Sequence, residues 1–266
     1  MRLFFRKYGS GTPLIILHGL FGSSDNWISV ARSLAESFTV YLPDQRNHGQ
    51  SPHSPVHDYG SMKDDLAQLA DDLDLEKFFL AGHSMGGRAA MLYALEFPER
   101  LNGLLVADIS PFRNKKNYND DREKYLGILN FMLNADLSVM TSRSAVESLM
   151  KSAVNQQKTR DLIMKNLKRR HDNSFSWKLN PQALLDNLER IMDGIIDDDT
   201  EAPSITGFPV FFLRGGLSSF IGESDFPGIM RLFPGAELIT VAGAGHWLHS
   251  DNPEAVAKCF HRFIEG

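Results

Sequence analysis

Short, almost entirely apolar runs recur along the chain and alternate with stretches in which apolar residues follow a helical spacing. The clearest runs are residues 14–17, 38–42, 78–81, 104–107, 210–213 and 238–241. A continuous apolar run of this length is typical of a β-strand covered on both faces, as in a parallel sheet. One more strand is predicted at residues 3–7, at an edge of the sheet, because a glycine-rich turn follows it.

Amphipathic stretches at residues 24–36, 60–74, 86–97 and 253–264 predict helices between and after the strands. In the last stretch, Val256, Phe260 and Phe263 recur at i, i+4 and i+7, and Pro253 suits the first turn of a helix. Strands that alternate with helices predict an α/β fold with a mostly parallel, doubly wound sheet.

The alternation stops between residues 112 and 205, which contain few strand-like runs. The leucines of this segment stand mostly at helical spacings: Leu126, Leu129, Leu133, Leu149, Leu162, Leu167 and Leu184. We therefore expect a helical insertion at 112–205 in a core made of 1–111 and 206–266. Its large apolar residues are expected to form the core of the insertion, with a few at the entrance to a site: Phe112, Phe131, Met132, Phe175 and Trp177. An acidic run, residues 197–199 with Glu201, is expected to be a solvated loop.

The composition is that of an ordinary globular chain: 266 residues, 42% hydrophobic and 23% charged, with a net charge of −5. This charge argues against nucleic acid as a main partner. One stretch is basic, with Lys158, Arg160, Lys165, Lys168, Arg169 and Arg170 close together. We interpret it as a solvated helix face; docking of an anionic substrate or surface is the alternative.

Cys259 is the only cysteine, so no disulfide can form within the chain, which fits a reducing compartment. Residues 1–7 contain no apolar stretch of signal-peptide length, and no apolar run approaches the roughly 20 residues that span a bilayer. We expect a cytoplasmic protein without stable membrane insertion. No feature of the sequence specifies an oligomeric state.

The strongest chemical motif is the G-x-S-x-G of Gly82, Ser84 and Gly86, between the strand at 78–81 and the helix at 86–97. This arrangement is typical of a nucleophile elbow, in which a sharp turn presents the serine. Glycines beside the serine allow the helix to approach the strand. An ordinary glycine-rich turn is the alternative. The motif predicts Ser84 as a nucleophile.

A serine hydroxyl needs a base to take its proton, and in enzymes with this elbow the acid and then the histidine follow the serine. The histidines well downstream are His171, His246, His249 and His261. His246 follows the strand at 238–241 in a glycine-bearing loop, where parallel sheets place reactive groups. We predict His246 as the base, His249 as a helix-entry or surface residue, and His261 as structural.

The acid of the triad is harder to assign, because the loop after the strand at 210–213 has Ser218 where an aspartate is usual. Asp108 ends the preceding strand and could reach the histidine nitrogen that faces away from Ser84. We predict Asp108 as the acid, with Glu223 or Asp225 as alternatives. The oxyanion needs backbone N–H donors, expected from Met85 and from the loop after residues 14–17, where Leu20 is the first choice and Phe21 the next.

Together these motifs resemble the α/β-hydrolase superfamily over nearly the whole chain. The matching segments are residues 18–23 (HGLFGS), 44–51 (DQRNHGQS), 82–87 (GHSMGG) and 242–247 (AGAGHW). They are most similar to YbfF-type bacterial esterases and abhydrolase domain-containing 11 proteins. The resemblance implies hydrolysis of small-molecule esters of short to medium or fatty acyl groups, without cofactor or metal, under a helical cap at 112–205. Phe21 and Trp247, beside the oxyanion loop and the base, are candidate substrate-binding residues. The loop at 44–51, with Arg46 and His48, is expected to be structural.

The expected function is therefore that of a serine esterase with a Ser84–His246–Asp108 triad and an acyl-enzyme intermediate. Thioesterase, lactonase or carbon–carbon bond hydrolase activity on the same triad is an alternative. A non-catalytic binding protein with the hydrolase fold is a further alternative from a different class.

Overall fold

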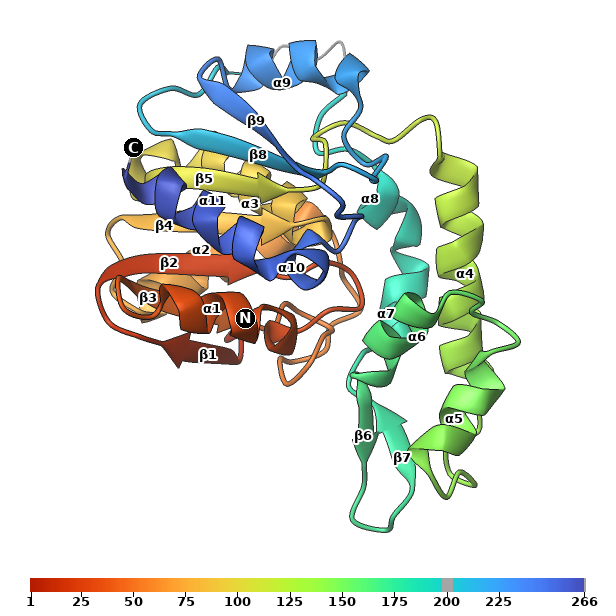
Figure 1. Ribbon diagram of the computed structural model, residues 1–266. Coiled ribbons are helices and arrows are strands. Elements are labelled where there is room, and N and C mark those ends of the chain that lie inside the picture. Colours follow the sequence, from red (N-terminus) through yellow and green to blue (C-terminus); the bar gives the residue numbers. More distant parts are fainter. Residues whose placement is uncertain (198–202, 266) are drawn as a thin grey trace.

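A seven-stranded sheet runs through the centre of the molecule in the order β1-β3-β2-β4-β5-β8-β9 (Figure 1). The computed structural model describes residues 1–197 and 203–265. The strands are β1 (Phe5–Tyr8), β2 (Thr12–Leu17), β3 (Phe38–Pro43), β4 (Phe78–His83), β5 (Leu101–Ala107), β8 (Val210–Gly215) and β9 (Ala236–Val241). β1 is antiparallel to β3, and the other neighbouring pairs are parallel. The predicted α/β class with a mostly parallel sheet is confirmed.

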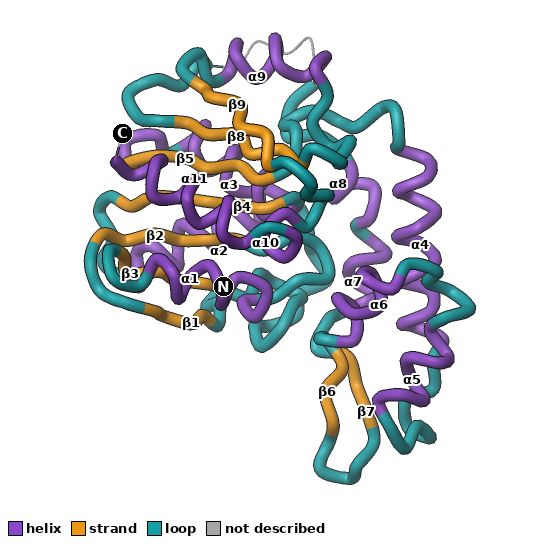
Figure 2. The backbone as a smooth tube through the Cα atoms, viewed as in Figure 1, coloured by secondary structure: helices purple, strands orange, loops and turns teal. Residues whose placement is uncertain are grey.

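Helices cover both faces of this sheet (Figure 2). They are η1 (Ser24–Trp27), α1 (Ile28–Leu34), α2 (Tyr59–Asp72), α3 (Met85–Glu96), η2 (Pro98–Arg100), η3 (Glu223–Asp225), α9 (Phe226–Leu232), α10 (Leu248–Asp251) and α11 (Pro253–Glu265). Buried residues of α1, α10 and α11 share one apolar cluster, and those of α2, α3 and α9 share the other. The sheet therefore separates two apolar layers, as a doubly wound fold requires.

Successive residues of the central strands enter opposite layers. In β2, Leu14 and Ile16 pack with α1 and α11, whereas Ile15 and Leu17 pack with α2 and α3. This explains why the strand sequences are continuously apolar. β9 departs from the prediction: it is an edge strand, with Glu237 exposed and Leu238 only half-buried, so it is not covered on both faces.

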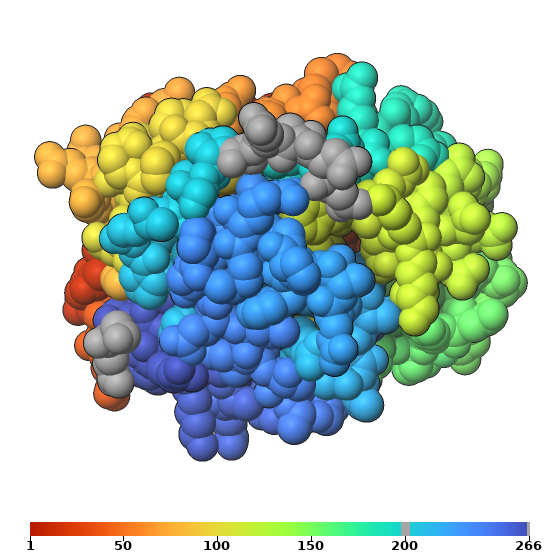
Figure 3. Space-filling model, turned by 90° about the horizontal axis from the view of Figure 1, so that it is seen from above, coloured from red at the N-terminus to blue at the C-terminus, as the bar shows by residue number. Residues whose placement is uncertain are grey.

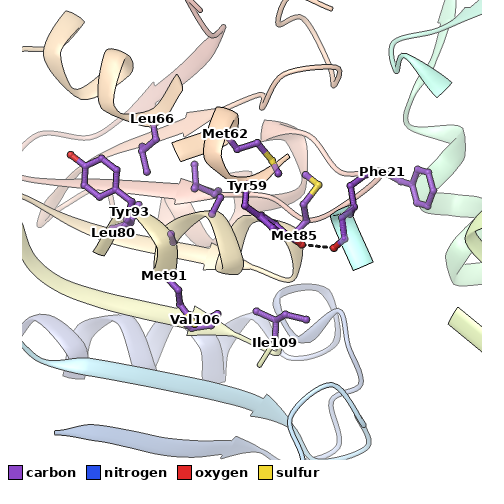
Figure 4. Close-up of a cluster of buried hydrophobic side chains, with 14 of the residues drawn as sticks. Phe21, Tyr59, Met62, Leu66, Leu80, Met85, Met91, Tyr93, Val106 and Ile109 are labelled. Atoms are coloured by element: carbon purple, nitrogen blue, oxygen red, sulfur yellow. Dashed lines mark hydrogen bonds between the residues drawn. The ribbon is translucent and has the colours of Figure 1, made fainter. Parts of the chain in front are cut away.

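The second layer is illustrated by the cluster in Figure 4, in which side chains from two helices meet the central strands. Its labelled members include Tyr59, Met62 and Leu66 of α2, Met85, Met91 and Tyr93 of α3, Leu80 of β4 and Val106 of β5. These side chains are buried and belong to one cluster. The cluster fixes α3 on the strands, and with it the turn that carries Ser84.

Element ends differ from the predictions where local hydrogen bonds intervene. The stretch at 24–36 begins as the 3₁₀ turn η1, whose first amide, Ser24 N, donates to Asp44 Oδ1 at 2.6 Å, and α1 ends at Leu34. β1 begins at Phe5 rather than at residue 3, because its pairing with β3 starts there. The last helix agrees with the prediction: α11 starts at Pro253 and buries Val256, Phe260 and Phe263.

Residues 112–197 lie beyond the carboxyl ends of β2, β4 and β5 (Figure 1). Their elements are α4 (Tyr118–Asn134), α5 (Arg143–Met150), α6 (Gln157–Met164), β6 (Leu167–Arg169), β7 (Phe175–Trp177), α7 (Pro181–Asp186) and α8 (Leu188–Met192). Figure 3 shows α4 and α5 (yellow-green and green) to one side of the C-terminal part of the chain. The β6–β7 hairpin was not predicted, and it places Leu167 in a strand. Among the leucines at helical spacings, Leu133 and Leu149 are exposed.

The basic stretch does not form one solvated helix face, so that prediction is wrong. α6 ends at Met164, and Lys168 and Arg169 belong to the hairpin that follows. Arg160 is buried and donates to the carbonyls of Val154 and Asn155, each at 2.7 Å. Of the acidic run, residues 198, 199 and 201 lie outside the described residues.

Candidate active site

Ser84 occupies the turn between β4 and α3 with φ 53° and ψ −122°. A positive φ is unfavourable for serine, and such strain is held in place by the packing around it. Here the packing is very close: a Cβ on Gly82 would lie 2.3 Å from Gly86 O, and one on Gly86 would lie 2.5 Å from His18 O. The two glycines of the motif are therefore required by the approach of α3 to β4 and to the loop after β2.

His246 lies between Ser84 and Asp108. Its Nε2 is 3.1 Å from Ser84 Oγ, and its Nδ1 is 2.7 Å from Asp108 Oδ2. Because an ionised carboxylate only accepts, Nδ1 carries the ring proton and Nε2 is free to accept one from Ser84. The three side chains come from the carboxyl ends of β4, β5 and β9, which parallel pairing brings to the same edge of the sheet.

Asp108 is fully buried and also has a positive φ of 53°. Its Oδ1 accepts a hydrogen bond from Gly215 N at 2.9 Å, and its Oδ2 accepts one from the Ser218 hydroxyl in addition to His246. The alternatives, Glu223 and Asp225, lie in η3, where Asp225 accepts a hydrogen bond from Gly222 N at 2.8 Å. The carboxylate beside His246 is thus that of Asp108.

Phe220 and His83 both contact His246. The Phe220 ring stacks on the His246 imidazole, with centroids 3.8 Å apart and planes 21° apart. His83 Nε2 donates to the backbone carbonyl of His246 at 2.7 Å. Burial, with the nearby charge of His246, lowers the pKa of His83 well below its usual value, so His83 is a neutral donor. No signal in the sequence marks this role, because His83 stands at an unspecified position of the G-x-S-x-G motif.

His249 lies at the start of α10, as expected for a helix-entry residue, but it is buried and not on the surface. Its ring stacks on Trp27 with centroids 4.5 Å apart. Burial lowers the pKa of His249 to about 3. It is therefore a neutral, packed side chain beside the site.

The loop after β2 approaches Ser84 closely, since a Cβ on Gly19 would lie 3.1 Å from Ser84 Cβ. The Gly19 carbonyl accepts from His18 Nδ1 and from Gly22 N, each at 2.9 Å. In a planar trans peptide the next N–H points away from the carbonyl, so these bonds also fix the direction of Leu20 N–H. Met85 is the first residue of α3, where the amides have no acceptor within the helix.

The loop at 44–51 supports this arrangement, in agreement with its structural interpretation. Gln45 N donates to His18 Nε2 at 3.0 Å, and Gln45 Nε2 donates to His18 O at 2.5 Å. Arg46 forms a buried ion pair with Asp65 at 2.6 Å. Since Gln45 satisfies His18 Nε2, His18 Nδ1 keeps the proton that it donates to Gly19.

Two cavities meet at Ser84. The smaller has a volume of about 40 Å³ and extends past Met85 toward Arg88, Ile109 and Met192. The larger has a volume of about 720 Å³ and is bordered by the candidate substrate residues Phe21 and Trp247. Leu20, Tyr125 and Phe220 border both. Of the large apolar residues of 112–205, Phe112, Met132 and Phe175 are buried in the core, as expected for most of them. None of the five (Phe112, Phe131, Met132, Phe175 and Trp177) borders either cavity, so the expectation that a few of them line the entrance is wrong for these two cavities.

Residues 1–197 and 203–265 contain no group of three His, Cys, Asp or Glu side chains that could hold a metal ion. In the same residues, no helix has both the length and the apolar character needed to cross a membrane.

A family model described as the alpha/beta hydrolase fold matches residues 12–253. The chain is an α/β-hydrolase. The sn-1-specific diacylglycerol lipase ABHD11 of Danio rerio is 37% identical to it over 94% of this chain and 77% of its own length. Esterase YbfF of Escherichia coli is 29% identical over 96% of this chain and 94% of its own length.

The solved structure of a marine microorganism esterase is similar over 98% of this chain and 99% of its own, with 39% identity and a TM-score of 0.93. The resemblance to YbfF-type and ABHD11 proteins is thus confirmed, as is the α/β-hydrolase fold. The predicted enzyme class, a carboxylic ester hydrolase, is confirmed at the level of these relatives.

Proposed function

We propose that this α/β-hydrolase is a serine esterase that hydrolyses small-molecule carboxylic esters, of short to medium acyl groups, through an acyl-enzyme. The nucleophile is Ser84, the base is His246 and the acid is Asp108. The observation that carries the proposal is the continuous pair of contacts, 3.1 Å from Ser84 Oγ to His246 Nε2 and 2.7 Å from His246 Nδ1 to Asp108 Oδ2, at the meeting point of two cavities.

In the first half-reaction, Ser84 Oγ attacks the ester carbonyl carbon while His246 Nε2 takes the hydroxyl proton. Asp108 stabilises the imidazolium that results and holds its orientation. The tetrahedral intermediate then breaks the bond to the alcohol oxygen, which receives the proton from His246 Nε2. The product of this step is the free alcohol and an ester of Ser84.

The negative charge on the tetrahedral oxygen requires donors that are already in place. Leu20 N–H and Met85 N–H supply them, the first fixed by the bonds to the Gly19 carbonyl and the second free at the start of α3. One such donor contributes on the order of 3 kcal/mol to lowering the barrier.

In the second half-reaction, water attacks the acyl carbon and gives its proton to His246 Nε2. The intermediate releases the carboxylic acid, and His246 returns the proton to Ser84 Oγ. Atoms and charges balance with water as the sole co-reactant, so the reaction needs no cofactor.

Residues 112–205 act as a cap on a core made of 1–111 and 206–266. Hydrogen bonds between the two parts support the position of the cap on the core: Asn166 Nδ2 donates to Phe21 O at 2.7 Å, and Asn180 N donates to Asn47 O at 3.0 Å. Since Phe21 follows Leu20, the cap is tied to the oxyanion loop. Phe21 and Trp247 border the larger cavity, which supports their assignment as substrate-binding residues.

A fluorophosphonate probe tests the nucleophile directly, because it modifies an activated serine irrespective of substrate. We expect the wild-type chain and a Ser33→Ala control on α1 to be labelled and to hydrolyse 4-nitrophenyl esters. The Ser84→Ala variant should lose both properties while keeping its thermal unfolding temperature. Labelling that persists in Ser84→Ala would assign the activated nucleophile to another residue and contradict the proposal. A wild-type chain that is neither labelled nor active would also contradict it and would support a non-catalytic binding protein.

Thioesters, lactones and carbon–carbon bonds would be cleaved by the same three side chains, so a panel of these substrates, compared by kcat/KM, identifies the preferred bond. A preference for one of them over esters would replace the esterase assignment. The cytoplasmic location expected from the sequence stays a prediction.

A further inference from the structure

The two cavities at Ser84 differ in their relation to His246. The larger is bordered by His246 and by its neighbours Gly245 and Trp247, none of which borders the smaller. The smaller is bordered by Ser84, by residues of α2, α3, α4 and α8 and by loop residues, among them Leu20 and Phe220, which it shares with the larger. Ser84 borders both, so the two parts of a bound ester can extend into different cavities.

The chemistry decides which part of the ester enters which cavity. The alcohol oxygen must receive its proton from His246 Nε2 as the bond to the acyl carbon breaks, so the alcohol lies on the His246 side. The acyl chain, on the other side of the carbonyl carbon, then enters the cavity that His246 does not border. The larger cavity is the alcohol site and the smaller is the acyl site.

Their volumes are very unequal, at about 720 Å³ and about 40 Å³. A single water needs roughly 10–15 Å³ of occupied volume, so the smaller cavity suits a short acyl chain and the larger one a bulky group. We propose that the enzyme is selective for esters that join a short acyl group, from acetyl to butyryl, to a bulky alcohol. This selectivity rests on the function proposed above.

The small volume is a property of the fold, because hydrogen bonds fix the walls. Arg88 is buried, and its guanidinium donates to the carbonyls of Ser110 at 3.1 Å, Phe112 at 2.6 Å and Asp193 at 2.7 Å. Tyr59 OH donates to the carbonyl of Ile191. These bonds join α2 and α3 to the loop after β5 and to α8, so widening the cavity would leave buried polar groups without partners.

The alcohol site accepts varied chemistry. Cations and anions both border it, with Lys124 and Lys165 on the cap and Asp25 on the core. Lys158 and Asp251, on opposite sides, form an ion pair at 2.7 Å. Because the charges are mixed, we expect this site to select alcohols by their size and not by their net charge. A neutral aromatic alcohol is therefore a suitable probe.

The first experiment measures kcat/KM for 4-nitrophenyl esters from acetate to dodecanoate. We expect kcat/KM to fall about 100-fold between butyrate and octanoate, since an acyl group that exceeds a rigid cavity is rejected by about this factor. An octanoate value equal to or above that of butyrate would overturn the proposal. If fluorophosphonate still labels Ser84 in that case, the esterase function stands and only the selectivity fails.

The second experiment shortens one lining residue of each cavity. Met192 borders the acyl site and Leu162 borders the alcohol site. Met192→Ala should raise kcat/KM for octanoate about tenfold, because it adds space for longer chains, and the matched Leu162→Ala should leave the acyl-length profile unchanged. If Leu162→Ala extends the profile and Met192→Ala does not, the two sites are reversed. Ile109→Val, a smaller change in the same wall, repeats the test should Met192→Ala fail to fold.

The third experiment varies the alcohol at constant acyl group. Ethyl acetate and 2-phenylethyl acetate have leaving groups of similar basicity but different size. We expect kcat/KM to be about tenfold higher for the phenylethyl ester, from the apolar surface that it buries in the larger cavity. Equal values for the two esters would contradict the assignment of that cavity to the alcohol.

Discussion

Ser218 and His246 bind the same oxygen of Asp108. The Ser218 hydroxyl and His246 Nδ1 both donate to Asp108 Oδ2, and Gly215 N donates to the other oxygen at 2.9 Å. A fully buried carboxylate needs such partners, and charge-assisted bonds from three donors also fix its orientation. Ser218, which stands where this type of enzyme usually has its acid, therefore positions an acid that comes from the neighbouring strand.

The Asp108→Asn substitution should lower kcat about 10⁴-fold at neutral pH, because an amide donor facing His246 Nδ1 favours the wrong imidazole tautomer. The measurement is kcat for a 4-nitrophenyl ester, with circular dichroism as the control for folding. Glu223→Gln and Asp225→Asn are expected to keep kcat close to wild type. A large loss in either of them, with little loss in Asp108→Asn, would move the acid to η3.

The Ser218→Ala substitution should lower kcat about tenfold, since it removes one charge-assisted donor from Asp108. The control is Ser219→Ala, which should leave kcat unchanged. The Ser219 hydroxyl accepts a hydrogen bond from the cap residue Asn117. In the Asp108→Asn background, Ser218→Asp should recover about tenfold in kcat, because it returns a carboxylate to this place. No recovery together with a folded double variant would show that position 218 cannot orient His246.

The His18→Ala substitution should lower kcat by about 10- to 100-fold while changing KM little. The imidazole fixes the Gly19 carbonyl, and without it Leu20 N–H is no longer held toward the transition-state oxygen. The exposed His53 supplies the control, His53→Ala, with both constants unchanged. A rise in KM at constant kcat would instead indicate that His18 acts on ground-state binding.

Stability should fall as the pH decreases from about 6.5 toward 3. Burial, together with the charge of Arg46, lowers the pKa of His57 to about 3, whereas a histidine of the unfolded chain titrates near 6.5. Between these values the unfolded chain binds a proton that the folded chain does not, which costs about 1.4 kcal/mol per pH unit for this residue. Above about pH 6.5, His57 is neutral in both states and does not reduce the free energy of unfolding. Below that pH, the free energy of unfolding falls as the pH falls.

Urea unfolding at pH 7 and pH 5 tests this dependence. In the His57→Gln variant, the decrease in the free energy of unfolding between the two pH values should be smaller than in wild type by about 2 kcal/mol. The exposed His53→Gln variant should keep the wild-type decrease. If the free energy of unfolding decreases as much in His57→Gln as in wild type, another group controls the loss of stability between pH 7 and pH 5.

Features that depend on local chemistry could be predicted from the order of the residues. Continuous apolar runs identified the central strands, because each strand is covered on both faces, and the glycines around Ser84 identified the elbow, because only they fit so sharp a turn. The position of His246 after a strand was also readable, since the carboxyl ends of parallel strands share one edge of the sheet.

The folded arrangement selects the carboxylate that meets His246, since Asp108 and His246 are 138 residues apart and the order β5-β8-β9 brings them together. It also decided the β6–β7 hairpin, whose three-residue strands are too short to give a periodic pattern, and the two unequal cavities. Those cavities are enclosed by elements from both ends of the chain. Their volumes depend on side chains that meet across the fold, and no spacing along the sequence records such contacts.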